Sequence, residues 1–61
     1  MKRVDIYTND AQKKPTYSFH SSLTKEEIVA EIFKCKIYAC QFNNKFIAIN
    51  TEKILFLEII E

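Results

Sequence analysis

The chain has 61 residues, 48% of them hydrophobic, and a formal net charge of +1 at pH 7. This length predicts a single domain, 1–61, with a small core, because chains this short bury only about 60% of their unfolded surface. The near-neutral charge argues against a broad nucleic-acid surface, and no apolar run approaches the about 20 residues of a membrane span.

Two alternating segments at the start of the chain predict a β-hairpin. In residues 2–8 and 16–20, apolar and polar side chains alternate, as they do in half-buried strands. The polar segment 9–15 between them predicts a loop with an exposed basic tip at Lys13 and Lys14.

A helix of about three turns is predicted after Leu23. Thr24 and Glu27 have the spacing of a capping box, with Thr24 as the N-cap residue and Glu27 at the third helical position. The apolar residues that follow have helical spacing and predict one buried stripe, formed by Ile28, Val29, Ile32 and Phe33.

Residues 36–60, KIYACQFNNKFIAINTEKILFLEII, predict three consecutive antiparallel strands. Asn43 and Asn44 suit a two-residue type I′ turn, which needs two residues with positive φ. A second turn at residues 50–53 would place Lys45 opposite Glu58, so that the only charges within these strands meet.

This register gives the predicted sheet two apolar faces. The first face is expected to lie under the helix and consists of Tyr38, Cys40, Phe42, Ile47, Ile49, Ile54 and Phe56. The second face is not covered by the helix and is the predicted interface, made of Ile37, Ala39, Phe46, Ala48, Leu55, Leu57 and Ile59. The alternatives to a homodimer are that a different protein docks on this face or that the first hairpin folds over it. The expected fold is therefore α+β, with a single antiparallel sheet of about five strands in the order β-β-α-β-β-β and one helix on one face.

The two cysteines, Cys35 and Cys40, indicate neither a disulfide framework nor a zinc site, because His20 alone cannot complete four ligands. We expect no metal and no cofactor, and a reducing, cytoplasmic location.

Catalytic chemistry has no convincing residue pattern. Ser22 and His20 could be joined with Asp5 or Asp10 as a nucleophilic triad, but their spacing does not require it. The chain has no glycine and therefore no glycine-rich phosphate loop. We expect no enzymatic activity.

A nucleic-acid-binding alternative rests on the first hairpin. Its basic residues could gather into one patch, with Tyr7 and Tyr17 as stacking partners. Asp5 and Asp10 interrupt this patch, whose candidate contacts are Lys2, Arg3, Lys13 and Lys14.

The segment KFIAINTEKILFLEI, preceded by a helix that opens with LTKEEI, resembles short uncharacterised proteins encoded by phages, prophages and plasmids of low-GC Gram-positive bacteria. The resemblance spans about residues 23–60. It implies a regulator or inhibitor that acts by binding a host protein, and no functional residue is carried over from it.

The sequence therefore predicts a small non-enzymatic interaction module that forms a homodimer through the uncovered sheet face. The alternative is a small nucleic-acid-binding regulator that uses the basic first hairpin.

Overall fold

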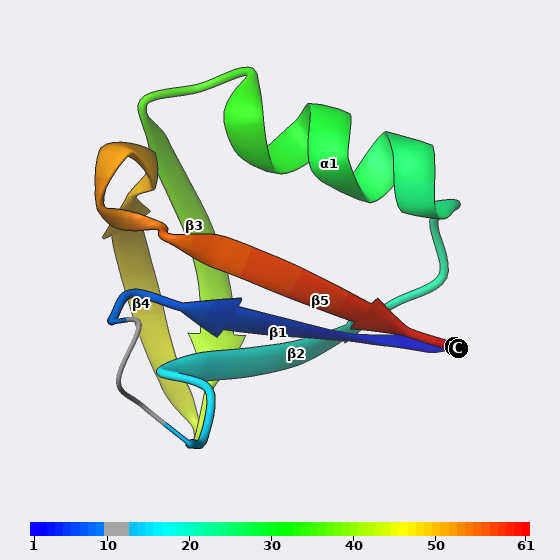
Figure 1. Ribbon diagram of the computed structural model, residues 1–61, viewed down its shortest axis with the longest axis horizontal. Coiled ribbons are helices and arrows are strands. Elements are labelled where there is room, and N and C mark those ends of the chain that lie inside the picture. The colour runs from blue at the N-terminus through cyan, green and yellow to red at the C-terminus, as the bar shows by residue number, and fades with distance from the viewer. Residues whose placement is uncertain (10–12) are drawn as a thin grey trace.

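The computed structural model describes residues 1–9 and 13–61, which form one helix and five strands in the predicted order β-β-α-β-β-β. The elements are β1 (Lys2–Tyr7), β2 (Tyr17–Ser21), α1 (Lys25–Phe33), β3 (Ile37–Phe42), β4 (Lys45–Asn50), the 3₁₀ turn η1 (Thr51–Lys53) and β5 (Phe56–Ile60). Figure 1 shows the strands curving around one interior, with α1 across the remaining side.

The prediction of a single sheet is wrong. The described strands form two sheets, one with the order β2-β1-β5 and one made of β3 and β4. The last strand does not pair with β4, as the predicted register required, but with β1. Glu58 therefore lies opposite Asp5 and not opposite Lys45.

The hairpin β3–β4 has the predicted register throughout. Phe42 lies opposite Lys45, and Ala39 lies opposite Ala48. The turn residues Asn43 and Asn44 have φ values of 52° and 62°, so both occupy the left-handed region that a type I′ turn requires. Asparagine tolerates this region better than other residues with a side chain, which explains a tight turn in a chain without glycine.

The chain leaves β4 through η1 and not through a second tight turn. A two-residue turn here would require positive φ at Thr51, which its β-branched side chain disfavours. Thr51 instead binds back to the start of β3: its N–H donates to the carbonyl of Lys36 at 2.8 Å, and its hydroxyl lies 3.0 Å from the carbonyls of Cys35 and Lys36. The N–H of Leu55 then donates to the carbonyl of Tyr7 at 2.8 Å, which directs the chain to β1.

Strand β1 is central because β2 and β5 pair with its two edges. Val4 lies between Phe19 and Ile59, and Ile6 lies between Tyr17 and Leu57, all on the inner face of the sheet. Val4 and Ile6 are fully buried, since every neighbour on this face is apolar.

The predicted helix start is confirmed. The hydroxyl of Thr24 accepts from the N–H of Glu27 at 3.2 Å, and the N–H of Thr24 donates to a carboxylate oxygen of Glu27 at 3.0 Å. The second of these bonds stabilises the ionised carboxylate, so the donation from the backbone N–H of Thr24 lowers the pKa of Glu27.

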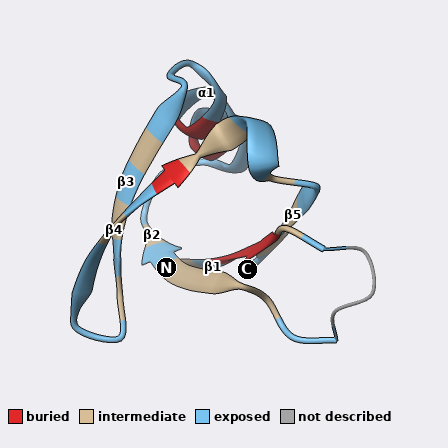
Figure 2. Ribbon diagram, turned by 90° about the vertical axis from the view of Figure 1, so that its left-hand side faces the viewer, coloured by how far each residue is buried: buried red, intermediate tan, exposed pale blue. Residues whose placement is uncertain are grey.

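The core is small and lies where the two sheets and the helix meet. It consists of Val4, Ile6, Ile28, Ile32 and Ile49. Tyr38, Cys40 and Ile47 extend it from the inner face of β3–β4, as the predicted first face required, whereas Phe56 is 45% exposed. Figure 2 shows the buried segments on the elements that surround this interior.

Replacing Thr24 by alanine should lower the free energy of unfolding by about 1 kcal/mol, because the helix loses its N-cap acceptor. Urea denaturation of both proteins at pH 7 measures this difference. An unchanged midpoint would show that the capping box does not stabilise α1.

The capping box also predicts a direction for the pH dependence. The folded-state pKa of Glu27 lies below its ordinary value of 4.5. The stabilisation of the folded state by the ionised Glu27 carboxylate is therefore present above the unfolded-state pKa. It is lost as pH falls through the lower, folded-state pKa. The stability difference between wild type and Glu27→Gln, which keeps the side-chain shape but does not titrate, should shrink over that interval in urea denaturation.

Asn43→Gly and Asn44→Gly should be neutral or stabilising, since glycine adopts positive φ without steric cost. Valine at either position should destabilise the protein by more than the about 0.5 kcal/mol of an ordinary surface change. Thermal denaturation of the four variants tests this, and two harmless valine variants would contradict the turn assignment.

Candidate interaction surfaces

The outer face of the β3–β4 sheet is exposed and carries no charged side chain. Phe46 is 76% exposed and Ile37 is 52% exposed. Between them lies the exposed pair Ala39–Ala48, and the other members of this face are Gln41 and Asn50. We call these six residues the hairpin face. A neutral, largely apolar face of this kind is typical of a surface that contacts another protein.

The structure divides the predicted interface between two places. Ile37, Ala39, Phe46 and Ala48 lie together on the hairpin face. Leu55 is 54% exposed in the segment that precedes β5. Leu57 and Ile59 lie elsewhere, on the inner face of the three-stranded sheet, where both pack against the core. The continuous face predicted from the sequence does not exist, because it depended on pairing between β4 and β5.

The outer face of the three-stranded sheet centres on Asp5, which is only 4% exposed. The hydroxyl of Ser18 donates to its carboxylate at 2.7 Å, and Nε of Arg3 lies 3.2 Å from the same oxygen. These partners satisfy a buried carboxylate that would otherwise be costly. Asp5 therefore stabilises the pairing of β1 with β2.

Tyr7 continues this outer face along β1. Its ring stacks on that of Phe56, with centroids 4.5 Å apart and planes 9° apart. Its hydroxyl donates to Glu58, and this bond, followed by burial, raises the pKa of Tyr7. The stack and the hydrogen bond hold β5 against β1, so Tyr7 has a structural role in joining these two strands.

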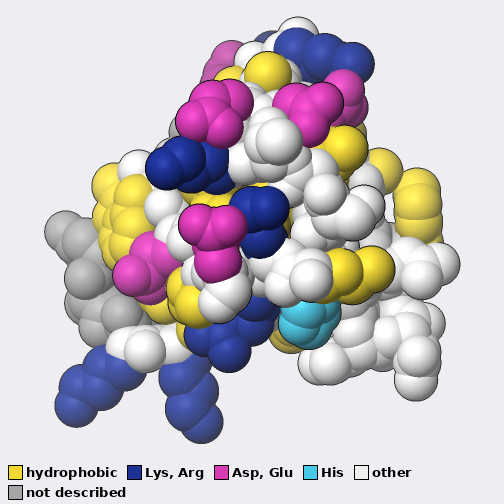
Figure 3. All heavy atoms as spheres, turned by 90° about the vertical axis from the view of Figure 1, so that its right-hand side faces the viewer, with side chains coloured by type: hydrophobic (Ala, Val, Ile, Leu, Met, Phe, Trp, Pro, Cys, Tyr) yellow, Lys and Arg dark blue, Asp and Glu magenta, His cyan; other side chains and the backbone are white. Residues whose placement is uncertain are grey.

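The basic residues of the first hairpin do not form one patch. Lys2 begins β1, whereas Lys13 and Lys14 lie in the loop beyond its other end, about 16–20 Å away for a six-residue strand. Lys2 lies 3.8 Å from Glu61, and Arg3 is paired with Asp5. Figure 3 shows acidic and basic side chains interspersed on this side of the molecule.

The hypothetical triad is not assembled. Among the described residues, His20 makes no hydrogen bond with Ser22 or Asp5, and Asp5 is instead held by β2 and Arg3. Asp10, the other acid considered, lies outside the described residues. Over residues 1–9 and 13–61, no three potential ligands are grouped in a way that could hold a metal ion.

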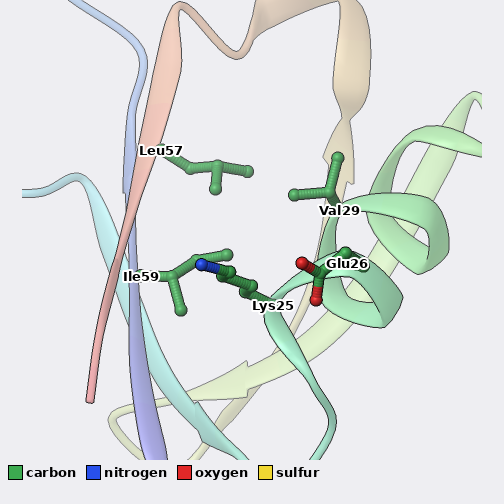
Figure 4. A pocket seen from close by; sticks show the side chains of 5 residues that line it. All are labelled: Lys25, Glu26, Val29, Leu57 and Ile59. Atoms are coloured by element: carbon green, nitrogen blue, oxygen red, sulfur yellow. The ribbon is translucent and has the colours of Figure 1, made fainter.

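A groove separates the first turns of α1 from β5. It has a volume of about 530 Å³ and is lined by Lys25, Glu26, Val29, Leu57 and Ile59. In Figure 4, Leu57 and Ile59 project from β5 toward the helix, and Val29 faces them from α1. Sequence reasoning missed this groove, because it assigned β5 to the wrong sheet and Val29 to the buried stripe.

No helix in the described part of the chain is long and apolar enough to cross a membrane.

Comparisons of the chain with protein-family models, with curated proteins and with solved structures gave no match.

The two thiols should differ in reactivity. Cys35 is exposed, whereas Cys40 is partly buried and burial raises its pKa. Because the thiolate is the nucleophile, iodoacetamide at pH 8 should alkylate Cys35 first. Peptide mass spectrometry measures both rates, and the rates should converge in urea. Equal rates in the native protein would contradict the placement of Cys40.

Proposed function

We propose that this protein is a non-enzymatic interaction module that associates with a second copy of itself through the hairpin face. The observation that carries the proposal is the uncharged outer face of β3–β4, with Phe46 76% exposed at one end. An exposed phenylalanine on a neutral sheet face gains free energy when another surface covers it.

The chemistry of the hairpin face favours a second copy as its occupant. Identical surfaces that carry charge repel each other when they meet, and this face carries none. The Ala39–Ala48 pair at its centre lets a facing sheet approach closely. A two-fold axis across this pair would bring the Phe46 end of one copy onto the Ile37 end of the other.

The size of the hairpin face indicates a reversible dimer. The face has two strands of six residues, about 20 Å long, and is smaller than the about 800 Å² per partner of a standard interface. Full burial of Phe46 or Ile37 would contribute about 1.5–3 kcal/mol each. We therefore expect dissociation constants in the micromolar range, at about −8 kcal/mol.

The resemblance of residues 23–60 to short phage and plasmid proteins supports a regulatory or inhibitory role in which such a dimer binds a host protein. A cytoplasmic location is part of the proposal, since both cysteines are free thiols and disulfides are rare there.

Nucleic-acid binding has less support than protein binding. The candidate basic residues are spread over both ends of the first hairpin, and two of them are engaged in ion pairs. Phosphate recognition needs several cations acting together on one surface.

Phe46→Lys should abolish self-association without unfolding the protein, because it places a charge in the dimer contact and Phe46 makes little contact within one chain. Sedimentation velocity over a range from low to high micromolar concentration measures the effect. The wild type should shift toward the dimer as its concentration rises.

The matched control is Phe33→Lys, which makes the same change at a half-exposed phenylalanine on α1 that is not one of the six residues of the hairpin face. This variant should dimerise like the wild type. A wild type that stays monomeric at high micromolar concentration would refute the proposal, and so would a Phe46→Lys variant that still dimerises.

A further inference from the structure

Strand β5 has a free edge. Among the described strands, only β1 pairs with it. In a strand, the N–H and C=O of one residue point to the same side, and successive residues alternate. Tyr7 directs its carbonyl toward β5, so Arg3 and Asp5 direct their backbone groups there too.

The register then identifies the outward groups of β5. The residues opposite Arg3, Asp5 and Tyr7 use their backbone groups in the β1–β5 ladder. Leu57 and Ile59 alternate with those residues, so their N–H and C=O groups point away from β1. Their side chains line the groove beside α1. The same two residues thus offer unpaired backbone groups and an apolar wall.

We propose that the groove between β5 and α1 binds an extended peptide segment of another protein, which adds to the sheet as a strand beside β5. The outward backbone groups of Leu57 and Ile59 require a strand as their partner. The apolar lining requires two apolar side chains at alternate positions of the peptide, packed between β5 and Val29.

A single strand fits here better than a second folded copy. Figures 1 and 4 both place α1 on the far side of the β5 edge from β1, so a second β5 would bring its own helix into the same space. The groove volume of about 530 Å³ is within the range of sites that hold small ligands or a few side chains.

The charges at the rim define one further feature of the peptide. Lys25 extends its ammonium group beside Ile59 at one end of the groove. No ion pair holds this ammonium among the residues that the structure describes. The Glu26 carboxylate also lines this end, on the helix side, so a peptide carboxylate is favoured beside Ile59, next to the Lys25 ammonium.

This site is separate from the hairpin face and can be tested separately. The probes are eight-residue peptides, acetylated and amidated at their ends, with Val, Ile, Leu or Phe at two alternate positions and Glu near the Lys25 end. Hydrogen exchange followed by NMR on the whole chain reports the Leu57 and Ile59 amides. Both should exchange fast in the free protein and slowly when a peptide is bound.

Two matched comparisons distinguish strand addition from binding through apolar side-chain contacts alone. N-methylation of the peptide residues whose N–H groups face β5 should abolish binding, and N-methylation of the intervening residues should not. Val29→Lys should weaken binding about tenfold or more, because it removes an apolar contact from the groove. Phe33→Lys, outside the groove lining, should leave binding unchanged.

The proposal is overturned if no peptide of the panel protects the two amides at about millimolar concentration, the weak limit of useful affinity. It is also overturned if both N-methylated forms bind equally. A Phe46→Lys variant that remains monomeric yet binds these peptides would show that the groove acts independently of dimerisation.

Discussion

The pairing of β1 through both of its edges is the constraint on which the rest of the structure depends. Val4 and Ile6 are fully buried because β2 and β5 each place apolar residues beside them. A hairpin of β1 and β2 alone would be marginal in water, since isolated two-stranded sheets rarely bury enough surface. The third strand comes from the far end of the chain, so the fold closes only when β5 reaches β1. The stack of Tyr7 on Phe56 reinforces this contact on the opposite face.

The pairing of β5 with β1, and not with β4, separates the two candidate surfaces. The hairpin β3–β4 keeps one face on the core but gains no third strand, and its other face is left without cover. Beside β1, strand β5 becomes the edge of the larger sheet, where α1 stands opposite it across a groove. The hairpin face is therefore limited to two strands, and the free edge of β5 lies beside the groove. Proteins commonly bind other proteins through surfaces of both kinds.

Because the core is small, burial of these surfaces would add noticeably to the stability of the protein. Domains of this size have little stability to spare, and five apolar side chains form the buried cluster among residues 1–9 and 13–61. Covering Phe46 or filling the groove beside Val29 would add apolar burial that the chain alone lacks. The buried polar group on the outer side of β1, Asp5, is by contrast held within the chain by Ser18 and Arg3. Association through apolar surface is therefore the behaviour that we propose for this protein.

The sequence alone determined the order of the elements, the capping box of α1 and the complete register of β3–β4. It could do so because the residues that decide each of these features are close together in the chain. Thr24 and Glu27 are three residues apart, and the asparagine turn brings its two strands together directly. The sequence also identified four of the six residues of the hairpin face as interface residues. The partner of β5 was decided only by the tertiary structure. The apolar pattern of Leu57 and Ile59 suits an edge of β4 as well as an edge of β1, and periodicity carries no information on which edge is chosen. That choice depends on the turn at Thr51, which is bonded to the carbonyl of Lys36, and on the burial of Val4 and Ile6 beside strand β5. The paired residues of β1 and β5 are about fifty positions apart in the chain.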